Sequence, residues 1–343
     1  MTEQQNPYVK QFPDLMSGKT IVYVHGFGSS GQSGTVTRLR TVLPSATVVA
    51  PDLPVNPHDA LSLLYKVCEE HHPSLIIGTS MGGMYAEQLY GFDRILVNPA
   101  FGIADTMGEH GLTGKQQFFS PRRDGVQEFY IDKPMVKAYR QVADQNFTHA
   151  DQPDEQLHVV GLFGDADPLV HTRPLFAEHY TQAIPFHGEH RLNDHSFMQS
   201  VVPVIRWIDD RQERRERPIV YVGIETLSGR DGQPAPSMVK AVRLLIERYQ
   251  LYFVSPANDS LTSRYAEVAT WLASHVGVPA WGHTVFTNQR HLLYGDYLIE
   301  TAAVPGTTAA SGPEPMATVI AYGSDAFKTW DEVIVYFERL GGQ

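Results

Sequence analysis

The serine in Gly78-Thr79-Ser80-Met81-Gly82 is the residue of this sequence best placed to do chemistry. An apolar run at 75–77 precedes it, and a segment with helical spacing at 81–90 follows it. In a G-x-S-x-G pattern the neighbours must be small, because the serine occupies a strained strand-to-helix turn where bulky side chains would collide with the sheet or the helix. An ordinary glycine-rich turn is the alternative, but the strand before and the helix after favour Ser80 as a nucleophile.

Two aspartates after a later strand are candidates for the acid of a catalytic triad. A serine hydroxyl is a poor nucleophile without a base, and in this motif's fold an acid and then a histidine follow the serine along the chain. The segment GDADPLV begins where the strand-like run at 158–163 ends, and it contains Asp165 and Asp167. Asp167 is the preferred acid and Asp165 the alternative, and the other aspartate would cap the turn.

Three histidines, His187, His190 and His195, compete for the role of general base. His190 lies just past the last strand and before the final helix, where a loop allows its imidazole to reach back to Ser80. His195 falls in the first turn of that helix and is the alternative, and His187 lies at the strand end. The sequence therefore predicts the set Ser80, Asp167 and His190.

An oxyanion hole requires backbone N–H groups rather than side chains. One donor is expected from Met81, directly after the nucleophile, and the other from Phe27 in the loop His25-Gly26-Phe27-Gly28. The glycines of that loop also suit a turn with positive φ.

Alternating strand-like and helix-like segments predict the elements that position these residues. Continuous apolar strands between helices indicate a parallel sheet covered on both faces, with its ligand site at the carboxyl ends of the strands. The loops HGFGSS, PDLP, GTSMGG and NPA all follow strands and should converge on that edge. The expected strands lie at 20–26, 47–50, 75–77, 94–97, 158–163 and 183–186, and the expected helices at 57–71, 81–90, 174–180 and 194–211. Residues 101–155 interrupt the alternation and are interpreted as a lid-like insertion with a helix at 134–143.

A second alternation begins after the charged stretch at 211–217. Strands are expected at 219–222, 251–254, 284–286, 297–299 and 318–321, helices at 237–249, 261–275 and 330–340, and a Pro/Gly-rich loop at 304–315. The sequence therefore predicts two α/β domains, 1–215 and a smaller one at 216–343.

Composition excludes several classes of partner and site. A formal net charge of −11 in 343 residues disfavours binding to nucleic acid. One cysteine, Cys68, excludes an internal disulfide, and no apolar run has membrane-spanning length. We therefore expect a cytoplasmic protein that binds neither membrane nor nucleic acid and needs no cofactor or metal.

The first domain resembles the small YqiA-type esterases of the α/β-hydrolase superfamily over residues 18–210. The resemblance is carried by VYVHGFGSSGQS, PDLPVNP, IIGTSMGGMYA, ILVNPA and GEHRLND. It implies esterase or thioesterase-like activity on small acyl substrates, with Ser80 as nucleophile, Asp167 as acid and His190 as the histidine.

The second domain resembles a haloacid-dehalogenase-type 5'-nucleotidase over residues 218–341. The resemblance is carried by IVYVGIE, LYFVSPAND, TNQRHLLYGDYLIET and AYGSDAFKTWDEVIVYF. It implies an Asp-x-Asp pair after the first strand, which takes the phosphoryl group and helps to hold Mg²⁺. Gly223 and Glu225 occupy those positions here, so the nucleophilic carboxylate is absent.

The remaining positions of that resemblance are partly kept. Ser255 matches the phosphate-binding hydroxyl, and Arg290 or Gln289 stands where the family has lysine. Asp296 and Glu300 lie near the acidic metal motif. This degenerate phosphatase-like site predicts a domain kept for packing, dimerisation or binding.

Three functions follow as hypotheses. The preferred one is a serine hydrolase that cleaves a small carboxylic ester or thioester through an acyl-enzyme. The alternatives are a non-catalytic binding or scaffold protein and a phosphatase acting through the second domain. A homo-oligomer is compatible with each of them.

Overall fold

The chain is divided into two compact units, Met1–Arg211 and Gln212–Gln343. The computed structural model describes residues 6–229, 231–257, 262–302 and 315–340. The predicted boundary between 215 and 216 lies just beyond this division, and the loop expected at 304–315 lies almost wholly outside the described residues.

The first unit is built on a six-stranded sheet in which every described pair of neighbours is parallel, in the order β2-β1-β3-β4-β7-β8. Residues from the middle strands are almost fully buried, as their continuous apolar runs predict. Its strands are β1 (Thr20–Val24), β2 (Thr47–Val49), β3 (Leu75–Thr79), β4 (Arg94–Val97), β7 (Val159–Gly164) and β8 (Ala183–Phe186).

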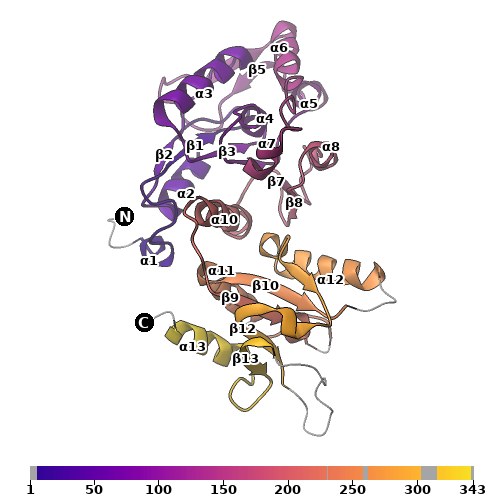
Figure 1. Cartoon of the computed structure of the whole chain (residues 1–343). Helices are drawn as coiled ribbons and strands as arrows, with labels where there is room; N and C mark the ends of the chain where they lie inside the picture. The colour runs from indigo at the N-terminus through magenta and orange to yellow at the C-terminus, as the bar shows by residue number, and fades with distance from the viewer. Residues whose placement is uncertain (1–5, 230, 258–261, 303–314, 341–343) are drawn as a thin grey trace. The chain divides into compact units, whose positions relative to one another are not determined.

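Helices cover both faces of this sheet, with α3 on one side and α2 and α10 on the other (Figure 1). The prediction of an α/β fold with a mainly parallel sheet is therefore confirmed. The helices outside the insertion are α1 (Tyr8–Gln11), α2 (Gly34–Val42), α3 (Pro57–His71), α4 (Met81–Glu87), α8 (Arg173–His179), α9 (Asp194–Ser196) and α10 (Val202–Gln212). A π-helical segment, Phe197–Val201, separates α9 from α10 where one continuous helix was expected.

The insertion contains more regular structure than the single predicted helix. It holds α5 (Ile103–Glu109), an antiparallel hairpin of β5 (Gly114–Gln117) and β6 (Glu128–Ile131), α6 (Lys133–Ala143) and α7 (Pro153–His158). Ile131, Tyr139 and Val142 belong to the same hydrophobic core as β1 and α4. This packing explains why every residue of α4 is buried.

The hairpin loop of the insertion is fastened to the loops at the carboxyl edge of the sheet. Phe119 donates its N–H to the Gly28 carbonyl oxygen at 2.7 Å, and Arg123 donates its N–H to the Asp52 carboxylate at 2.7 Å. The second oxygen of Asp52 accepts the N–H of Gly31, also at 2.7 Å. The Asp52 carboxylate thus joins the insertion to the loop after β1. Hydrogen bonds hold this part of the insertion against the loops at the carboxyl edge of the sheet.

The second unit contains a five-stranded sheet, parallel at every described pair, in the order β11-β10-β9-β12-β13. Its strands are β9 (Ile219–Gly223), β10 (Gln250–Ser255), β11 (Thr284–Phe286), β12 (Tyr294–Thr301) and β13 (Met316–Tyr322), and its α-helices are α11 (Met238–Arg248), α12 (Thr262–His275) and α13 (Trp330–Leu340). β12 is longer than the predicted 297–299 and begins at Tyr294. Short 3₁₀ helices occur at Ile224–Thr226, Val278–Ala280 and Arg290–Leu292.

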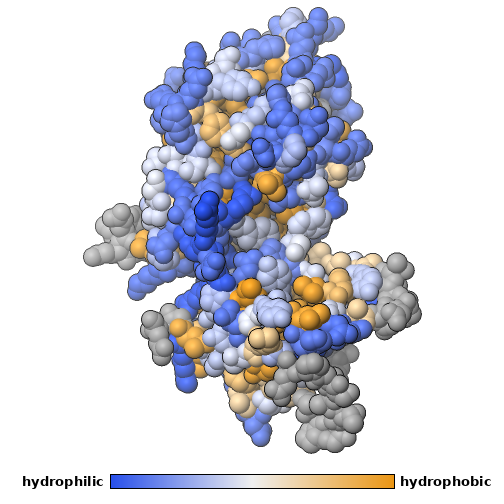
Figure 2. Space-filling view, viewed as in Figure 1, coloured by the Kyte–Doolittle hydropathy of each residue, from blue (hydrophilic) through white to orange (hydrophobic). Residues whose placement is uncertain are grey.

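The surface of the first unit is mainly hydrophilic on the face shown in Figure 2. Among the described residues, no helix is both long enough and apolar enough to cross a bilayer.

Candidate active site

Ser80 occupies a sharp turn between β3 and α4. Its backbone has φ 55° and ψ −121°, a conformation that L-residues adopt only under constraint. Gly78 and Gly82 make this turn possible, because a Cβ at either position would crowd its neighbours. A Cβ on Gly78 would lie 2.7 Å from the Ala86 Cβ, and a Cβ on Gly82 would lie 2.7 Å from the His25 carbonyl oxygen. Larger residues at these two positions would therefore collide with α4 and with the end of β1, as the motif predicts.

The hydroxyl of Ser80 forms a continuous hydrogen-bond chain with His190 and Asp167. His190 Nε2 lies 3.0 Å from Ser80 Oγ, and His190 Nδ1 lies 2.8 Å from Asp167 Oδ2. The strand order brings these residues together, since β3, β7 and β8 all end at the same edge of the sheet. A proton on Nδ1 leaves Nε2 free to accept the serine proton, which is the arrangement that activates a serine hydroxyl.

Asp167 is held as a carboxylate by its surroundings. Its second oxygen accepts the N–H groups of Leu169 at 2.8 Å and Val170 at 3.0 Å. Burial by itself would raise the pKa of Asp167, but the hydrogen bond from His190 and those from the two N–H groups outweigh it and hold the pKa below its usual value. The side chain is 1% exposed, so an ionised acid faces the imidazole without solvent screening.

The alternative residues lie elsewhere. Asp165 pairs with His187 at 3.1 Å and accepts the N–H of Gly188 at 3.1 Å, so it joins the loops after β7 and β8. His187 has a side chain that is 84% exposed. His195 is exposed in the first turn of α9, which Asn193 caps. None of these three residues is hydrogen bonded to Ser80 among the described contacts.

Asn98, after β4, is a residue of this site that the sequence reasoning did not single out. It is 2% exposed and adopts φ 45°. Its side-chain oxygen accepts the N–H of Gly164 at 2.7 Å, and its amide nitrogen donates to the carbonyl oxygens of Glu189 at 3.1 Å and His190 at 3.2 Å. It therefore ties the acid loop to the histidine loop, and the NPA motif following a strand was the only sequence signal for it.

Of the two predicted oxyanion donors, Met81 follows Ser80 directly and Phe27 lines the same cavity as Ser80. Among the described residues, none accepts a hydrogen bond from the backbone N–H of Phe27 or Met81. The ring of His25 supports the Phe27 loop, since Nδ1 lies 2.9 Å from the Gly26 carbonyl oxygen and Nε2 lies 3.1 Å from the Leu53 nitrogen. Burial lowers the pKa of His25 to about 4, so the ring is neutral at pH 7 and can accept the Leu53 N–H.

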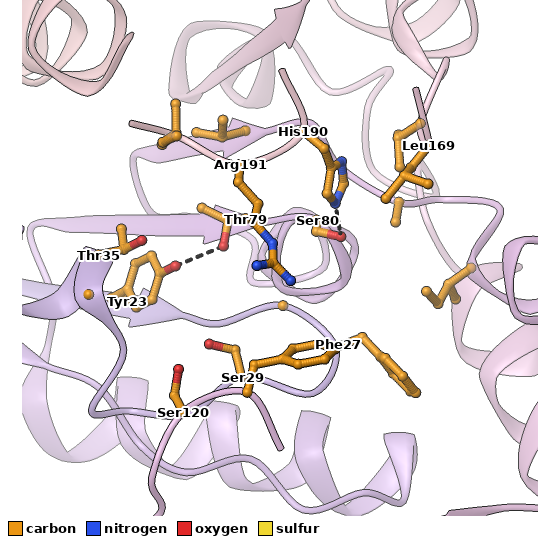
Figure 3. Close-up of a pocket in the computed structure, with 18 of the residues that line it drawn as sticks. Tyr23, Phe27, Ser29, Thr35, Thr79, Ser80, Ser120, Leu169, His190 and Arg191 are labelled. Carbon is orange, nitrogen blue, oxygen red and sulfur yellow. Dashed lines mark hydrogen bonds between the residues drawn. The ribbon is translucent and has the colours of Figure 1, made fainter. Parts of the chain in front are cut away.

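Ser80 and His190 open onto a cavity of about 430 Å³ (Figure 3). The loops after β1 and β7, the insertion and the histidine loop contribute to its wall. Apolar side chains come from Phe27, Val97, Ala100, Ile103, Leu112, Phe119, Leu169, Val170 and Leu192, and polar ones from Tyr23, Ser29, Thr35, Arg38, Thr79, Thr106, Ser120 and Arg191. The site can therefore take a molecule of small-substrate size.

The predicted phosphatase-like site of the second unit is only partly assembled. Gly223 ends β9, and the Glu225 carboxylate folds back over it, with its carboxyl carbon 2.7 Å from the position that a Cβ on Gly223 would take. Ser255 is fully buried, and its hydroxyl donates weakly to the Pro256 carbonyl oxygen at 3.4 Å. Arg290 forms an ion pair with Glu300.

The expectation that Asp296 belongs to this site is wrong. Because Ile299 pairs with Val222 in the parallel register, Asp296 lies beside the start of β9. Its carboxylate accepts the N–H of Ile219 at 2.7 Å, at the opposite edge of the sheet from Gly223. Asp296 lies at the amino end of the strand in the predicted range, 297–299, as well as in β12, and is therefore separated from the carboxyl edge where β9 ends.

The residues of this edge do not fit the Mg²⁺ that the fold resemblance implies. Mg²⁺ takes carboxylate oxygens in octahedral geometry, whereas one aspartate is replaced by Gly223 and the Glu300 carboxylate is paired with Arg290. Among the described residues no group of three or more His, Cys, Asp or Glu side chains could hold a metal.

Comparison with known proteins gives one family match and one curated relative. Residues 20–157 match an uncharacterised protein family, UPF0227, and this range includes Ser80 but ends before Asp167 and His190. The chain is 23% identical over 154 residues to a putative 5'(3')-deoxyribonucleotidase of Vibrio phage KVP40, a match that covers 37% of this chain and 88% of the phage protein.

Similar solved structures include several hydrolases. The N-acyl homoserine lactonase AidH, complexed with N-butanoyl homoserine, is 13% identical, with a TM-score of 0.37 over 57% of this chain and 90% of its own. Est1E from Butyrivibrio proteoclasticus is 14% identical, with a TM-score of 0.39 over 59% of this chain and 90% of its own. The thioesterase domain from the curacin biosynthetic pathway is 16% identical, with a TM-score of 0.33 over 55% and 90%. All three are similar to this chain over little more than half of its length.

Proposed function

We propose that the first unit is a serine hydrolase that cleaves a small carboxylic ester or thioester through an acyl-enzyme. The single observation that carries this proposal is the chain from Ser80 Oγ through His190 to Asp167, with distances of 3.0 and 2.8 Å. Such a chain on a strained strand-to-helix turn is the geometry that acyl transfer requires.

In the acylation step, Ser80 Oγ attacks the carbonyl carbon of the ester while its proton passes to His190 Nε2. The electron pair of the C=O π bond moves to oxygen, and the N–H groups of Phe27 and Met81 stabilise that negative charge. Collapse of the tetrahedral intermediate breaks the bond to the alcohol or thiol, which leaves with the proton from Nε2. The acyl group remains on Oγ.

Deacylation repeats these steps with water as the nucleophile. Water gives a proton to His190 Nε2 and attacks the acyl carbon, and collapse of the second intermediate returns that proton to Ser80 Oγ. A carboxylic acid is released. Throughout, the Asp167 carboxylate holds the proton on Nδ1 and stabilises the imidazolium that forms twice per turnover.

A non-catalytic binding protein is the alternative for this unit. A binding role would not require backbone strain at Ser80, a buried ionised acid and two N–H groups without partners among the described residues. Such features cost folding free energy and persist where function requires them.

Turnover of p-nitrophenyl acetate tests the proposal. Ser80→Ala should lower kcat by at least about a thousandfold, because triad members act as a unit. Ser62→Ala, on the exposed side of α3, is the matched control and should retain full activity. Equal turnover by the Ser80→Ala variant and the parent protein would refute the mechanism.

We infer that the second unit has no phosphatase activity of its own. At the position of the nucleophilic aspartate stands Gly223, which has no side chain to form a phosphoryl intermediate.

A further inference from the structure

The charge of the substrate cavity differs from that of the chain as a whole. The chain carries a formal net charge of −11. Among the described residues that line the cavity there are two arginines, Arg38 and Arg191, and no aspartate or glutamate. A cavity of this sign attracts an anion.

Only one of these guanidinium groups is available to a ligand. Arg38 forms an ion pair with Asp194 and also donates to the Leu192 carbonyl oxygen at 3.4 Å. Arg191 makes no ion pair and no hydrogen bond with any described residue. Its guanidinium carbon lies over the face of the Phe119 ring, 5.2 Å from the ring centroid.

Arg191 adjoins both the catalytic histidine and the insertion. It follows His190 directly, and Asn98 holds the His190 carbonyl oxygen. Phe119, on which the guanidinium rests, is itself held by the hydrogen bond from its N–H to Gly28. A guanidinium that lies over a ring face keeps its in-plane N–H donors free. The Arg191 side chain can therefore offer paired N–H donors to a ligand in the cavity.

Figure 3 shows this guanidinium extending into the cavity beside Ser80, towards the hydroxyl of Ser29. Ser120 lies on the same side, as do Tyr23 and Thr35. Leu169 lies on the other side of Ser80. Ser80 thus lies between the Arg191 guanidinium, with hydroxyl groups near it, and the apolar side chain of Leu169.

We propose that the substrate of this hydrolase is an amphipathic anionic ester or thioester, in which Arg191 binds a carboxylate or phosphate on one side of the scissile bond. This inference rests on the proposed serine hydrolase activity and adds the class of its substrate. Arg recognises planar and tetrahedral oxyanions through paired N–H donors, and the serine hydroxyls can supply further hydrogen bonds. An apolar part of the same substrate contacts Leu169 on the other side of Ser80.

Two matched pairs of esters test the proposal and distinguish an anion on the acyl group from one on the leaving group. The first pair is mono-p-nitrophenyl glutarate and p-nitrophenyl pentanoate. The second pair is p-butanoyloxybenzoate and p-butanoyloxybenzamide. In at least one pair, the parent protein should show a higher kcat/KM for the anionic member, and this preference should weaken as ionic strength rises.

Variants of Arg191 then test whether this residue causes the preference for the anionic ester. Arg191→Gln should lower kcat/KM for the preferred anionic ester by about ten- to a hundredfold, the usual effect of losing a charged hydrogen bond, and should alter the neutral partner by less than about threefold. Arg191→Lys keeps the charge but lacks the paired N–H donors of a guanidinium. Its kcat/KM for the anionic ester should lie between those of the parent and Arg191→Gln. Lys66→Gln, which removes one charge from the exposed side of α3, is the control and should match the parent.

The outcomes separate this inference from the activity on which it rests. Ester hydrolysis that requires Ser80 but shows no preference in either pair would overturn the anionic substrate and leave the hydrolase intact. An equal loss for anionic and neutral esters in Arg191→Gln would also overturn it, because Arg191 would then act only on the fold of the site. Hydrolysis that does not require Ser80 would overturn the hydrolase itself.

Discussion

Asn98 donates a hydrogen bond to the main-chain carbonyl oxygen of His190 at 3.2 Å, although 92 positions separate the two residues in the chain. The same side chain accepts the N–H of Gly164, which directly precedes the acid loop. One buried amide therefore fixes the distance between the loops that carry Asp167 and His190. Catalytic groups must be held within fractions of an ångström, so we regard Asn98 as a positioning residue.

Asn98→Asp tests this relationship. The substituted side chain keeps an oxygen for the Gly164 N–H but cannot donate to the carbonyl oxygens of Glu189 and His190. We expect kcat to fall by about ten- to a hundredfold with little change in KM, because the loss affects alignment rather than ester binding. Steady-state kinetics measure both constants, and a change confined to KM would contradict the positioning role.

Exchanging the two aspartates of the GDAD segment for asparagine separates their roles. Asp167→Asn should lower kcat by about a hundredfold or more, because an amide does not fix the proton on His190 Nδ1. Asp165→Asn should alter kcat by less than about threefold, since the Asp165 side chain is hydrogen bonded to His187 and Gly188 and, among the described residues, not to His190 or Ser80. A larger effect at Asp165 would transfer the role of the acid.

The lowered pKa of Asp167 has a consequence for acid stability. A carboxylate whose folded pKa lies below its unfolded value stabilises the fold above that unfolded value, which is 3.8 here. This contribution is lost only as the pH falls through the lower, folded pKa. The parent protein should therefore keep the stabilisation from Asp167 at pH 5 and lose it below about pH 4, and Asp167→Asn should lack this acid-dependent component in urea unfolding.

His25 should make the first unit less stable in mild acid. Its unfolded pKa is 6.5 and its folded pKa is about 4, so the unfolded chain binds the proton first. Stability from the neutral ring is complete above pH 6.5 and decreases between pH 6.5 and 4, by roughly 3 kcal/mol in all. Hydrogen–deuterium exchange of the β1 amides, corrected for intrinsic rates, measures this loss.

His25→Asn is the comparison for that measurement. The variant should be less stable than the parent at pH 7.5, and the difference between the two should shrink as the pH falls to 4. A difference that stays constant over this range would show that His25 titrates equally in the folded and unfolded chain.

The second unit should release no phosphate from nucleoside monophosphates, with or without Mg²⁺. The reason is the missing carboxylate at Gly223, together with the Glu300 carboxylate committed to Arg290. Phosphate release by the full chain is the measurement. Mg²⁺-dependent turnover that survives Ser80→Ala and is lost in Glu225→Gln would show a working phosphatase in this unit.

Much of the fold could be predicted because continuous apolar strands alternate with helices in both halves of the chain. The set Ser80, Asp167 and His190 followed from chain order together with the rule that loops after parallel strands share one edge. Their hydrogen bonds agree with that prediction, and their catalytic roles remain predictions.

Other features depend on interactions that sequence periodicity does not encode. The role of Asn98 requires a positive φ and three partners far along the chain. In the β5–β6 hairpin, β5 (GKQQ) has no apolar side chain and β6 (EFYI) has three consecutive ones, so no alternation marked it. The resemblance grouped Asp296 with Glu300, but Asp296 lies near the amino end of β12, away from the carboxyl edge of the sheet.

Covalent labelling of the intact chain by a fluorophosphonate probe tests the central claim most directly, because only an activated serine reacts with it. Mass spectrometry of the labelled and digested protein should find one modified residue, Ser80. The Ser80→Ala and His190→Ala variants should remain unlabelled under conditions that label Ser62→Ala fully. Labelling of the Ser80→Ala variant at the parent rate, or no labelling of the folded parent protein, would contradict the account.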